Sequence, residues 1–138
     1  MATFNRIQID LPEGWQDGSV LQLTEPTAGN TIPATITLRR TPLEAGVDAP
    51  TLARTYEASL PAALPGCEIL QSEVIEVDGR AVHRIEFRWP MGGSLFRRVQ
   101  ATLVNGRQSL VLVCTGADAG FTTYEPLFQR AISSLRVS

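Results

Sequence analysis

Several functions are excluded by what this 138-residue chain lacks. It contains no lysine, so arginine supplies all twelve basic residues, and the formal net charge is −2. Nucleic-acid phosphates call for a basic excess, which is missing. The one histidine, His83, has no second histidine with which to hold zinc. No apolar run approaches the roughly 20 residues of a membrane-spanning helix. We therefore expect no nucleic-acid partner, no metal site and no membrane insertion.

Cysteine is also scarce. Cys67 and Cys114 lie far apart, and neither belongs to a C-x-x-C pair. This spacing favours two reduced thiols in a cytosolic protein and leaves a disulfide as the open alternative. The N-terminal stretch MATFNRIQIDLP lacks the basic and apolar segments of a signal peptide. We therefore expect a cytoplasmic location.

Motifs of the common catalytic classes are missing as well. The chain has no G-x-S-x-G, no glycine-rich phosphate loop and no H-E-x-x-H, and neither cysteine has a histidine at a motif spacing. We expect no enzymatic activity and no cofactor. An enzyme that uses His83 and a carboxylate remains an alternative, although the strand carboxylates stand beside arginines, as in ordinary ion pairs.

What is present predicts a single α+β domain over residues 1–138, with a twisted antiparallel sheet of about six to seven strands and two helices. Alternating apolar residues and turn signals predict strands at 4–11, 19–24, 34–40, 67–77, 80–89, 94–104 and 107–115. Asp48 is expected to cap the first helix, which Pro65-Gly66 ends. Thr122 or Thr123 is expected to cap the last.

Two turns define hairpin registers, because Asp-Gly and Asn-Gly favour two-residue loops. These are Asp78-Gly79 and Asn105-Gly106. They predict that Val74 pairs with His83, Glu73 with Arg84, Ala101 with Leu110, and Val99 with Leu112. The middle hairpin, around Gly92-Gly93, has a choice of loop length. A three-residue loop, which we prefer, opposes Ile85 to Val99, whereas a four-residue loop opposes Ile85 to Arg98.

This register sorts the strand residues onto two faces. The expected core face carries Leu70, Val74, His83, Ile85, Phe87, Trp89, Leu95, Val99, Ala101, Leu103, Leu110 and Leu112. The second face is expected to carry the pairs Glu73–Arg84 and Glu86–Arg98 beside Phe96, Gln100, Val111 and Val113, joined by Val20, Gln22, Thr35 and Thr37. The stretch RQSLVLVCT is thus apolar on both sides. Its second side is either a half-solvated surface with scattered valines or a recognition surface.

The order of these motifs resembles DcrB-related proteins with the PsbP-like fold. The run IDLPEGWQDGSVLQL is similar to their opening, LPGCEILQSEVIEVDGRAVHRIEFRW to their middle, and YEPLFQRAISSL to their closing helix. Among them, members of this length without a leader resemble the Eag chaperones of type VI secretion. That resemblance implies a homodimer that binds and solubilises the hydrophobic N-terminal helices of an effector, here called the client, before export.

The resemblance also implies which residues bind the client. They are Val20, Gln22, Thr35, Thr37, Tyr56, Leu60, Leu64, Phe96, Gln100, Thr102, Val111 and Val113. Leu60 and Leu64 fit a core position equally well. Gln22 and Thr37 are polar where related sequences are aliphatic, which implies a shallower groove or a less apolar client. The alternative function is a non-enzymatic module that binds a small ligand or lipid, or serves in the cell envelope.

Overall fold

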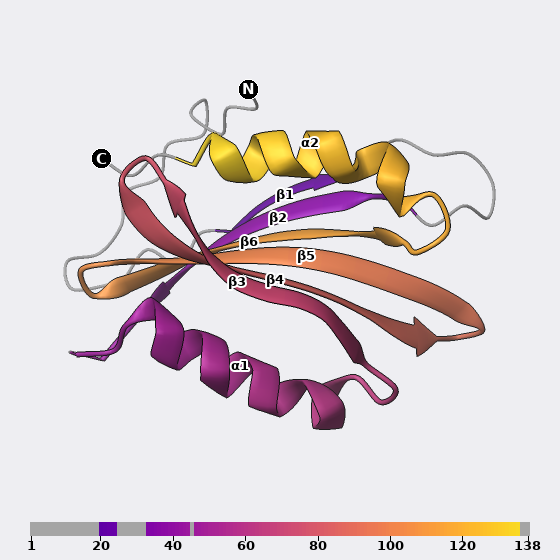
Figure 1. Cartoon of the computed structure of the whole chain (residues 1–138), viewed down its shortest axis with the longest axis horizontal. Coiled ribbons are helices and arrows are strands. Elements are labelled where there is room, and N and C mark those ends of the chain that lie inside the picture. Colours follow the sequence, from indigo (N-terminus) through magenta and orange to yellow (C-terminus); the bar gives the residue numbers. More distant parts are fainter. Residues whose placement is uncertain (1–19, 25–32, 45, 136–138) are drawn as a thin grey trace, which may run out of the picture.

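An antiparallel sheet lies between two helices (Figure 1). The computed structural model describes residues 20–24, 33–44 and 46–135. The elements are β1 (Val20–Thr24), β2 (Thr35–Pro42), α1 (Ala49–Ala63), β3 (Glu68–Val77), β4 (Arg80–Met91), β5 (Ser94–Asn105), β6 (Gln108–Ala117) and α2 (Phe121–Ser133). Their order across the sheet is β1-β2-β6-β5-β4-β3. The predicted α+β class with two helices is confirmed.

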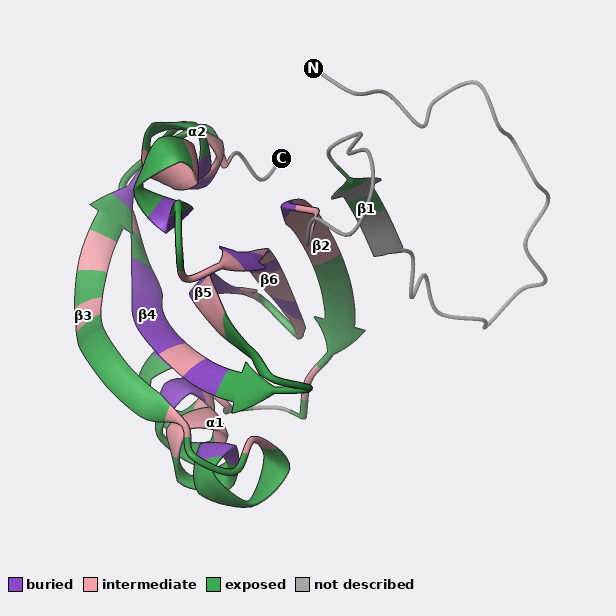
Figure 2. Ribbon diagram, turned by 90° about the vertical axis from the view of Figure 1, so that its right-hand side faces the viewer, coloured by how far each residue is buried: buried purple, intermediate pink, exposed green. Residues whose placement is uncertain are grey.

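The sheet has five long strands, fewer than the six to seven strands expected. Five strands have eight or more residues, and β1 is a five-residue strand at one edge. The predicted first strand, 4–11, lies outside the described residues. The opposite edge is β3, which is largely exposed, whereas the adjacent β4 is largely buried (Figure 2).

One hydrophobic cluster fills the space between the sheet and α2. Phe121, Phe128 and Ile132 of α2 are buried against side chains of β5 and β6 such as Ala101 and Leu112. Ile36 and Leu38 of β2 pack against the same cluster, as their alternation predicts. We call this side of the sheet the α2 face.

A second, smaller cluster lies on the other side of the sheet, beneath α1. Leu60 is buried there with Ile85, Phe87 and Trp89 of β4. Tyr56 packs at its border, 6.1 Å from the Phe87 ring between centroids. We call this side the α1 face. The two faces alternate along every strand, so each helix buries its own set of strand residues.

The helix starts follow from local chemistry. Asp48 caps α1 as predicted, because its Oδ1 accepts a hydrogen bond of 2.9 Å from the Thr51 N–H. The predicted threonine cap of α2 is wrong. That helix begins at Phe121 after Gly120, whose φ of 87° is a left-handed conformation that glycine adopts readily. This turn leaves Phe121 buried in the cluster beneath α2.

Hairpin registers depart from prediction in two of three cases. The β3–β4 register is confirmed, with Val74 opposite His83 and Glu73 opposite Arg84. The β5–β6 hairpin is displaced by two residues, so that Ala101 faces Leu112 and not Leu110. A two-residue displacement keeps each side chain on its predicted face.

The β4–β5 prediction is wrong by one residue. The loop contains two residues, Gly92-Gly93, and Ile85 therefore lies opposite Gln100. Both loop lengths considered from the sequence were too long. A one-residue error changes the face of every side chain in the pairing. Glu86 accordingly lies opposite Val99 and not Arg98.

This shift corrects the predicted core. Ile85, Phe87, Trp89 and His83 lie on the α1 face, not with the residues beneath α2. On β3, Val74 is 61% exposed and Leu70 is also exposed, so neither is a core residue. Leu95, near the β4–β5 turn, is exposed as well.

Candidate binding face of the sheet

Most predicted binding residues lie on one face of the sheet. Antiparallel partners share a face, and one row of partners runs from Ile85 through Gln100, Val113 and Thr37 to Gln22. The neighbouring rows contain Val20, Thr35, Phe96, Thr102 and Val111. Tyr56 and Leu60 come from α1, and Leu64 is the residue that ends it. The structure therefore brings together residues that are up to 93 positions apart in the chain, from Val20 to Val113.

The predicted binding residues differ in how far their side chains are exposed to solvent. Leu60, Gln100 and Thr102 are buried, and Leu60 is only 2% exposed. For Leu60, the core alternative is the one that the structure supports. The half-buried members are Thr35, Thr37, Tyr56, Leu64, Phe96, Val111 and Val113, and Gln22 is exposed. The side chain of Val20 lies outside the described set.

The half-buried members on the strands flank α1. This helix packs mainly on β4 and β5, and so the α1 face of β6 and β2 lies beside the helix. The second side of RQSLVLVCT is here, with Val111 and Val113 next to Arg39 and Thr37 of β2. The surface is a mixture of aliphatic groups, threonine hydroxyls and amides.

Two arginines of the strands belong to this face: the exposed Arg39, opposite Val111, and the half-buried Arg98. Arg98 stands between Phe87 and Thr115 in the cross-strand rows. Its guanidinium carbon lies 4.8 Å from the Trp89 ring centroid and 5.9 Å from that of Phe87. Its Nε donates a hydrogen bond of 2.9 Å to Thr115 Oγ1. The sequence predicted Arg98 on the same face as Phe96 and Gln100, which is confirmed, but its predicted partner Glu86 lies on the opposite face.

A polar cluster joins α1 to the sheet. Ser72 Oγ lies 2.5 Å from Glu57 Oε1 and 2.9 Å from His83 Nε2. The hydroxyl donates its one proton to the carboxylate, and it then accepts from the histidine N–H. His83 Nε2 also lies 3.4 Å from Glu57 Oε1, so the three side chains contact one another. The cluster is therefore an arrangement that fastens α1 to β3 and β4.

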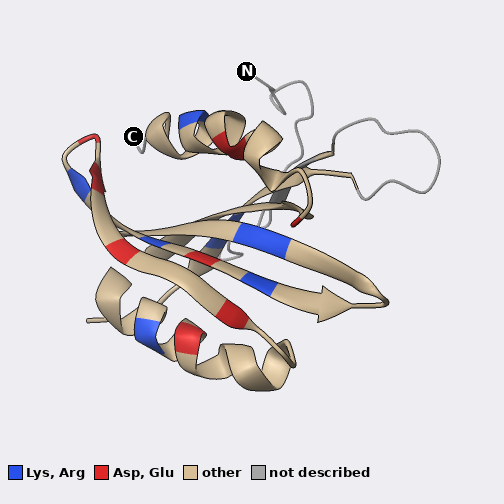
Figure 3. Ribbon diagram, turned by 45° about the vertical axis from the view of Figure 1, so that its right-hand side comes forward, with Lys and Arg blue, Asp and Glu red and all other residues tan. Residues whose placement is uncertain are grey.

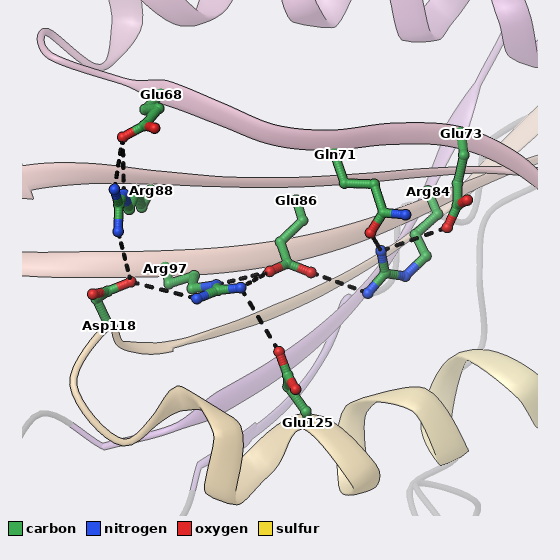
Figure 4. Close-up of polar contacts among 9 residues, drawn as sticks. All are labelled: Glu68, Gln71, Glu73, Arg84, Glu86, Arg88, Arg97, Asp118 and Glu125. Carbon is green, nitrogen blue, oxygen red and sulfur yellow. Dashed lines mark hydrogen bonds and ion pairs between the residues drawn. The ribbon is translucent and has the colours of Figure 1, made fainter.

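The opposite, α2 face carries a chain of ion pairs (Figure 4). Glu86, whose side chain is 7% exposed, binds both Arg84 and Arg97. Arg97 also approaches Glu125 of α2, and Arg88 approaches Asp118. The other contacts run from Arg84 to Glu73 and Gln71, from Arg88 to Glu68, and from Arg97 to Asp118. The predicted Glu73–Arg84 pair exists, but on this face.

The two cysteines lie in different environments. Burial raises the pKa of the Cys114 thiol to about 12, and it more than offsets the opposing influence of Arg84. Burial also raises the pKa of Cys67, which is only half-buried. Cys114 belongs to the cluster beneath α2 and Cys67 borders the one beneath α1. Both thiols are free, so the disulfide alternative is not supported.

The described residues contain neither a candidate metal site nor a membrane-spanning helix. Within residues 20–24, 33–44 and 46–135, no three potential ligands cluster as a metal would need. The described helices are not both long and apolar enough to cross a membrane.

Comparison with known proteins identifies a family. Residues 7–134 match the family model described as DcrB. No curated protein matches the sequence.

Solved structures share the fold at low sequence identity. PA94 of Pseudomonas aeruginosa, a protein of unknown function, is 18% identical with a TM-score of 0.84, over 99% of this chain and 95% of that one. The cyanobacterial PsbP protein of Synechocystis is 12% identical with a TM-score of 0.62, over 94% and 98%. LpqN, involved in cell envelope biogenesis in Mycobacterium tuberculosis, is 16% identical with a TM-score of 0.57, over 80% and 79%.

Proposed function

The chain belongs to the DcrB family, and from this premise we propose that it is a cytoplasmic chaperone of the type VI secretion system. In this role it binds the hydrophobic N-terminal helices of an effector and keeps them soluble until export. It acts as a homodimer and performs no catalysis. The resemblance of its sequence to the Eag chaperones implies what the client is, and we assign the binding of that client to the α1 face.

The observation that carries the proposal is the convergence of the predicted residues on the α1 face. Strand register aligns the predicted residues of β1, β2, β5 and β6, and the packing of α1 on the sheet adds those of the helix. Val111 and Val113 remain half-buried beside α1, where a further apolar group could cover them. Covering apolar area is favourable by about 25 cal/mol per Å².

The composition of the face fits such a client. A membrane helix in water aggregates unless its apolar surface is covered, and a groove can cover it. Threonine hydroxyls such as those of Thr35 and Thr37 suit the small and polar residues that line helix-packing faces in membranes. The exposed amide of Gln22 extends this polar character toward the sheet edge. A client of mixed polarity is therefore the better match.

The test is co-expression with the first ~60 residues of a candidate type VI effector, long enough for about two membrane-length helices. We expect the fragment to stay soluble and to co-purify with the wild-type protein. Val111→Asp should reduce co-purification about tenfold or more, because a carboxylate covered by an apolar helix loses its hydration. The measurement is the amount of fragment in the soluble, purified complex.

The matched control is Leu127→Asp. Leu127 is 50% exposed on α2, on the other side of the sheet, so its substitution adds the same charge away from the α1 face. Circular dichroism should show both variants folded. Fragments that pellet with the wild-type protein, across several candidate effectors, would contradict the proposal. Equal losses in the two variants would also do so.

A second candidate is a module of the cell envelope that binds a lipid or small ligand. One observation favours it: LpqN, which shares the fold, is involved in cell envelope biogenesis. Such a module would retain a lipid-like molecule in place of an effector helix. Native mass spectrometry of the purified protein distinguishes the two, because only this module would carry a bound small molecule.

A further inference from the structure

We propose that Arg98 recognises a carboxylate on the client, so that the helix held on the α1 face carries an Asp or Glu in its apolar sequence. This inference rests on the proposed function, because it names a feature of the same client. It follows from how charge is distributed between the two faces of the sheet.

Three neighbouring arginines on the α2 face have carboxylate partners. Arg84, Arg88 and Arg97 each form at least one ion pair with a glutamate. Arg98 follows Arg97 directly and therefore points to the other face. Among the residues that the structure describes, no carboxylate lies within 4.0 Å of its guanidinium. Figure 3 shows the adjacent arginines on β5, and Figure 4 shows the ion-pair network of the α2 face, which includes Arg97 and does not include Arg98.

The guanidinium of Arg98 is held ready for a ligand. It lies over the Trp89 and Phe87 rings, and its Nε is bound to Thr115. Within the described residues, no hydrogen bond occupies its two terminal nitrogens. Side chains that are ordered before binding lose less entropy on binding. A fixed fork of N–H groups suits the two oxygens of a carboxylate.

The neighbourhood makes an acidic partner better than a neutral one. A helix that covers the α1 face would exclude water from Arg98, and an unpaired charge without water is costly. A client carboxylate removes that cost, whereas a neutral amide can accept hydrogen bonds but leaves the charge of Arg98 uncompensated. The hydroxyls of Thr115 and Thr35 continue the same cross-strand row and keep the site polar. Arg98 would thus select among hydrophobic helices.

The probes are synthetic helices of 20 residues, made of Leu, Ala and Ser and fused to a soluble carrier protein. One set carries a single Glu at each of four successive central positions, which samples every side of the helix. A matched set carries Gln at the same positions. We expect one or more Glu probes to bind the full chain about tenfold more tightly than their Gln twins, which is about 1.4 kcal/mol, because only the Glu probes compensate the charge of Arg98.

Substitution of Arg98 tests whether this residue causes the tighter binding of Glu probes. Arg98→Gln should abolish the difference between Glu and Gln probes. Arg88→Gln, which removes a charge from the opposite face, should leave it unchanged. Arg98→Glu should restore binding of a third probe set that carries Arg at the same positions. Circular dichroism establishes that each variant is folded. If Arg98→Gln is unfolded, Arg98→Lys takes its place, because lysine keeps the positive charge but lacks the paired N–H donors of arginine.

The outcomes separate the inference from the proposed function. If Glu and Gln probes bind the wild-type protein equally well, the client-carboxylate inference is overturned and the chaperone proposal stands. The inference is also overturned if Arg98→Gln weakens both probe sets alike, since Arg98 would then contact a neutral group. If no probe and no effector fragment binds, both proposals are overturned.

Discussion

At the scale of single residues, charged side chains have different kinds of partner on the two faces of the sheet. On the α2 face, Glu86 is surrounded by Arg84 and Arg97 and compensated by both. Breaking such a buried pair costs about 3–5 kcal/mol, because it leaves an isolated buried charge. On the α1 face, Arg98 is compensated mainly by aromatic rings, which contribute roughly 0.5–2 kcal/mol. Arg98 is therefore a half-buried charge with room for an external partner, whereas the other arginine of this face, Arg39, is exposed to solvent.

The cysteines allow a prediction at this same scale. Only the thiolate reacts with alkylating agents, and burial raises the pKa of Cys114 to about 12. In Cys67→Ser, we expect no alkylation at pH 8 in the native state and complete alkylation in denaturant. In Cys114→Ala, the half-buried Cys67 should react in the native state. Mass spectrometry over time gives both rates, and comparable native rates would contradict the predicted difference.

The raised pKa also has a consequence for stability. Below pH 9.0, the ordinary value for the thiol, Cys114 is protonated in both the folded and unfolded states. As the pH rises from 9.0 toward about 12, the unfolded thiol ionises first, and the folded state loses relative stability. Alkaline pH should therefore destabilise the wild-type protein more than Cys114→Ala.

At the scale of elements, the β4–β5 turn decides which residues line the α1 face. Gly92 and Gly93 have φ angles of 60° and 80° and form a two-residue loop. Positive φ at both central positions is the signature of a type I′ turn, which matches the twist of paired strands. The resulting register places Phe96, Arg98 and Gln100 on the same face as Ile85 and Trp89.

Gly93→Ala tests this turn. Alanine in a left-handed conformation costs about 1–2 kcal/mol, so the free energy of unfolding in urea should fall by that amount. The matched control is Gly116→Ala in β6, where φ is ordinary and an added Cβ would lie 3.7 Å from Phe121, a normal contact. It should leave stability unchanged or raise it. A larger loss for Gly116→Ala than for Gly93→Ala would show that the turn conformation has little effect on stability.

At the scale of the whole molecule, the proposed role as a homodimer separates the two candidate functions. The resemblance to the Eag chaperones implies a homodimer, in which two copies would present two α1 faces to an effector helix. We expect twice the 15.0 kDa chain mass in sedimentation equilibrium at micromolar concentration. A monomer at that concentration would favour the ligand-binding module.

The extent to which the fold was predictable differs among its parts. The sequence alone determined the α+β class, the Asp48 cap, the β3–β4 register and the apolar side of α2. These depend on local patterns, such as an Asp-Gly turn or a helical spacing from Phe121 to Ile132, which act over a few residues. The two faces of RQSLVLVCT also followed from alternation, which a two-residue displacement leaves intact.

Only the tertiary structure decided the register between β4 and β5. Several loop lengths are compatible with Met-Gly-Gly-Ser, and the choice among them depends on how distant side chains pack. With the two-residue loop, Ile85, Phe87 and Trp89 lie beneath Leu60 of α1, and Glu86 reaches Arg97. Those contacts join segments that are far apart in the chain, so no local pattern reveals them. For the same reason, the contacts of Arg98 with the Phe87 and Trp89 rings could not be predicted from the sequence.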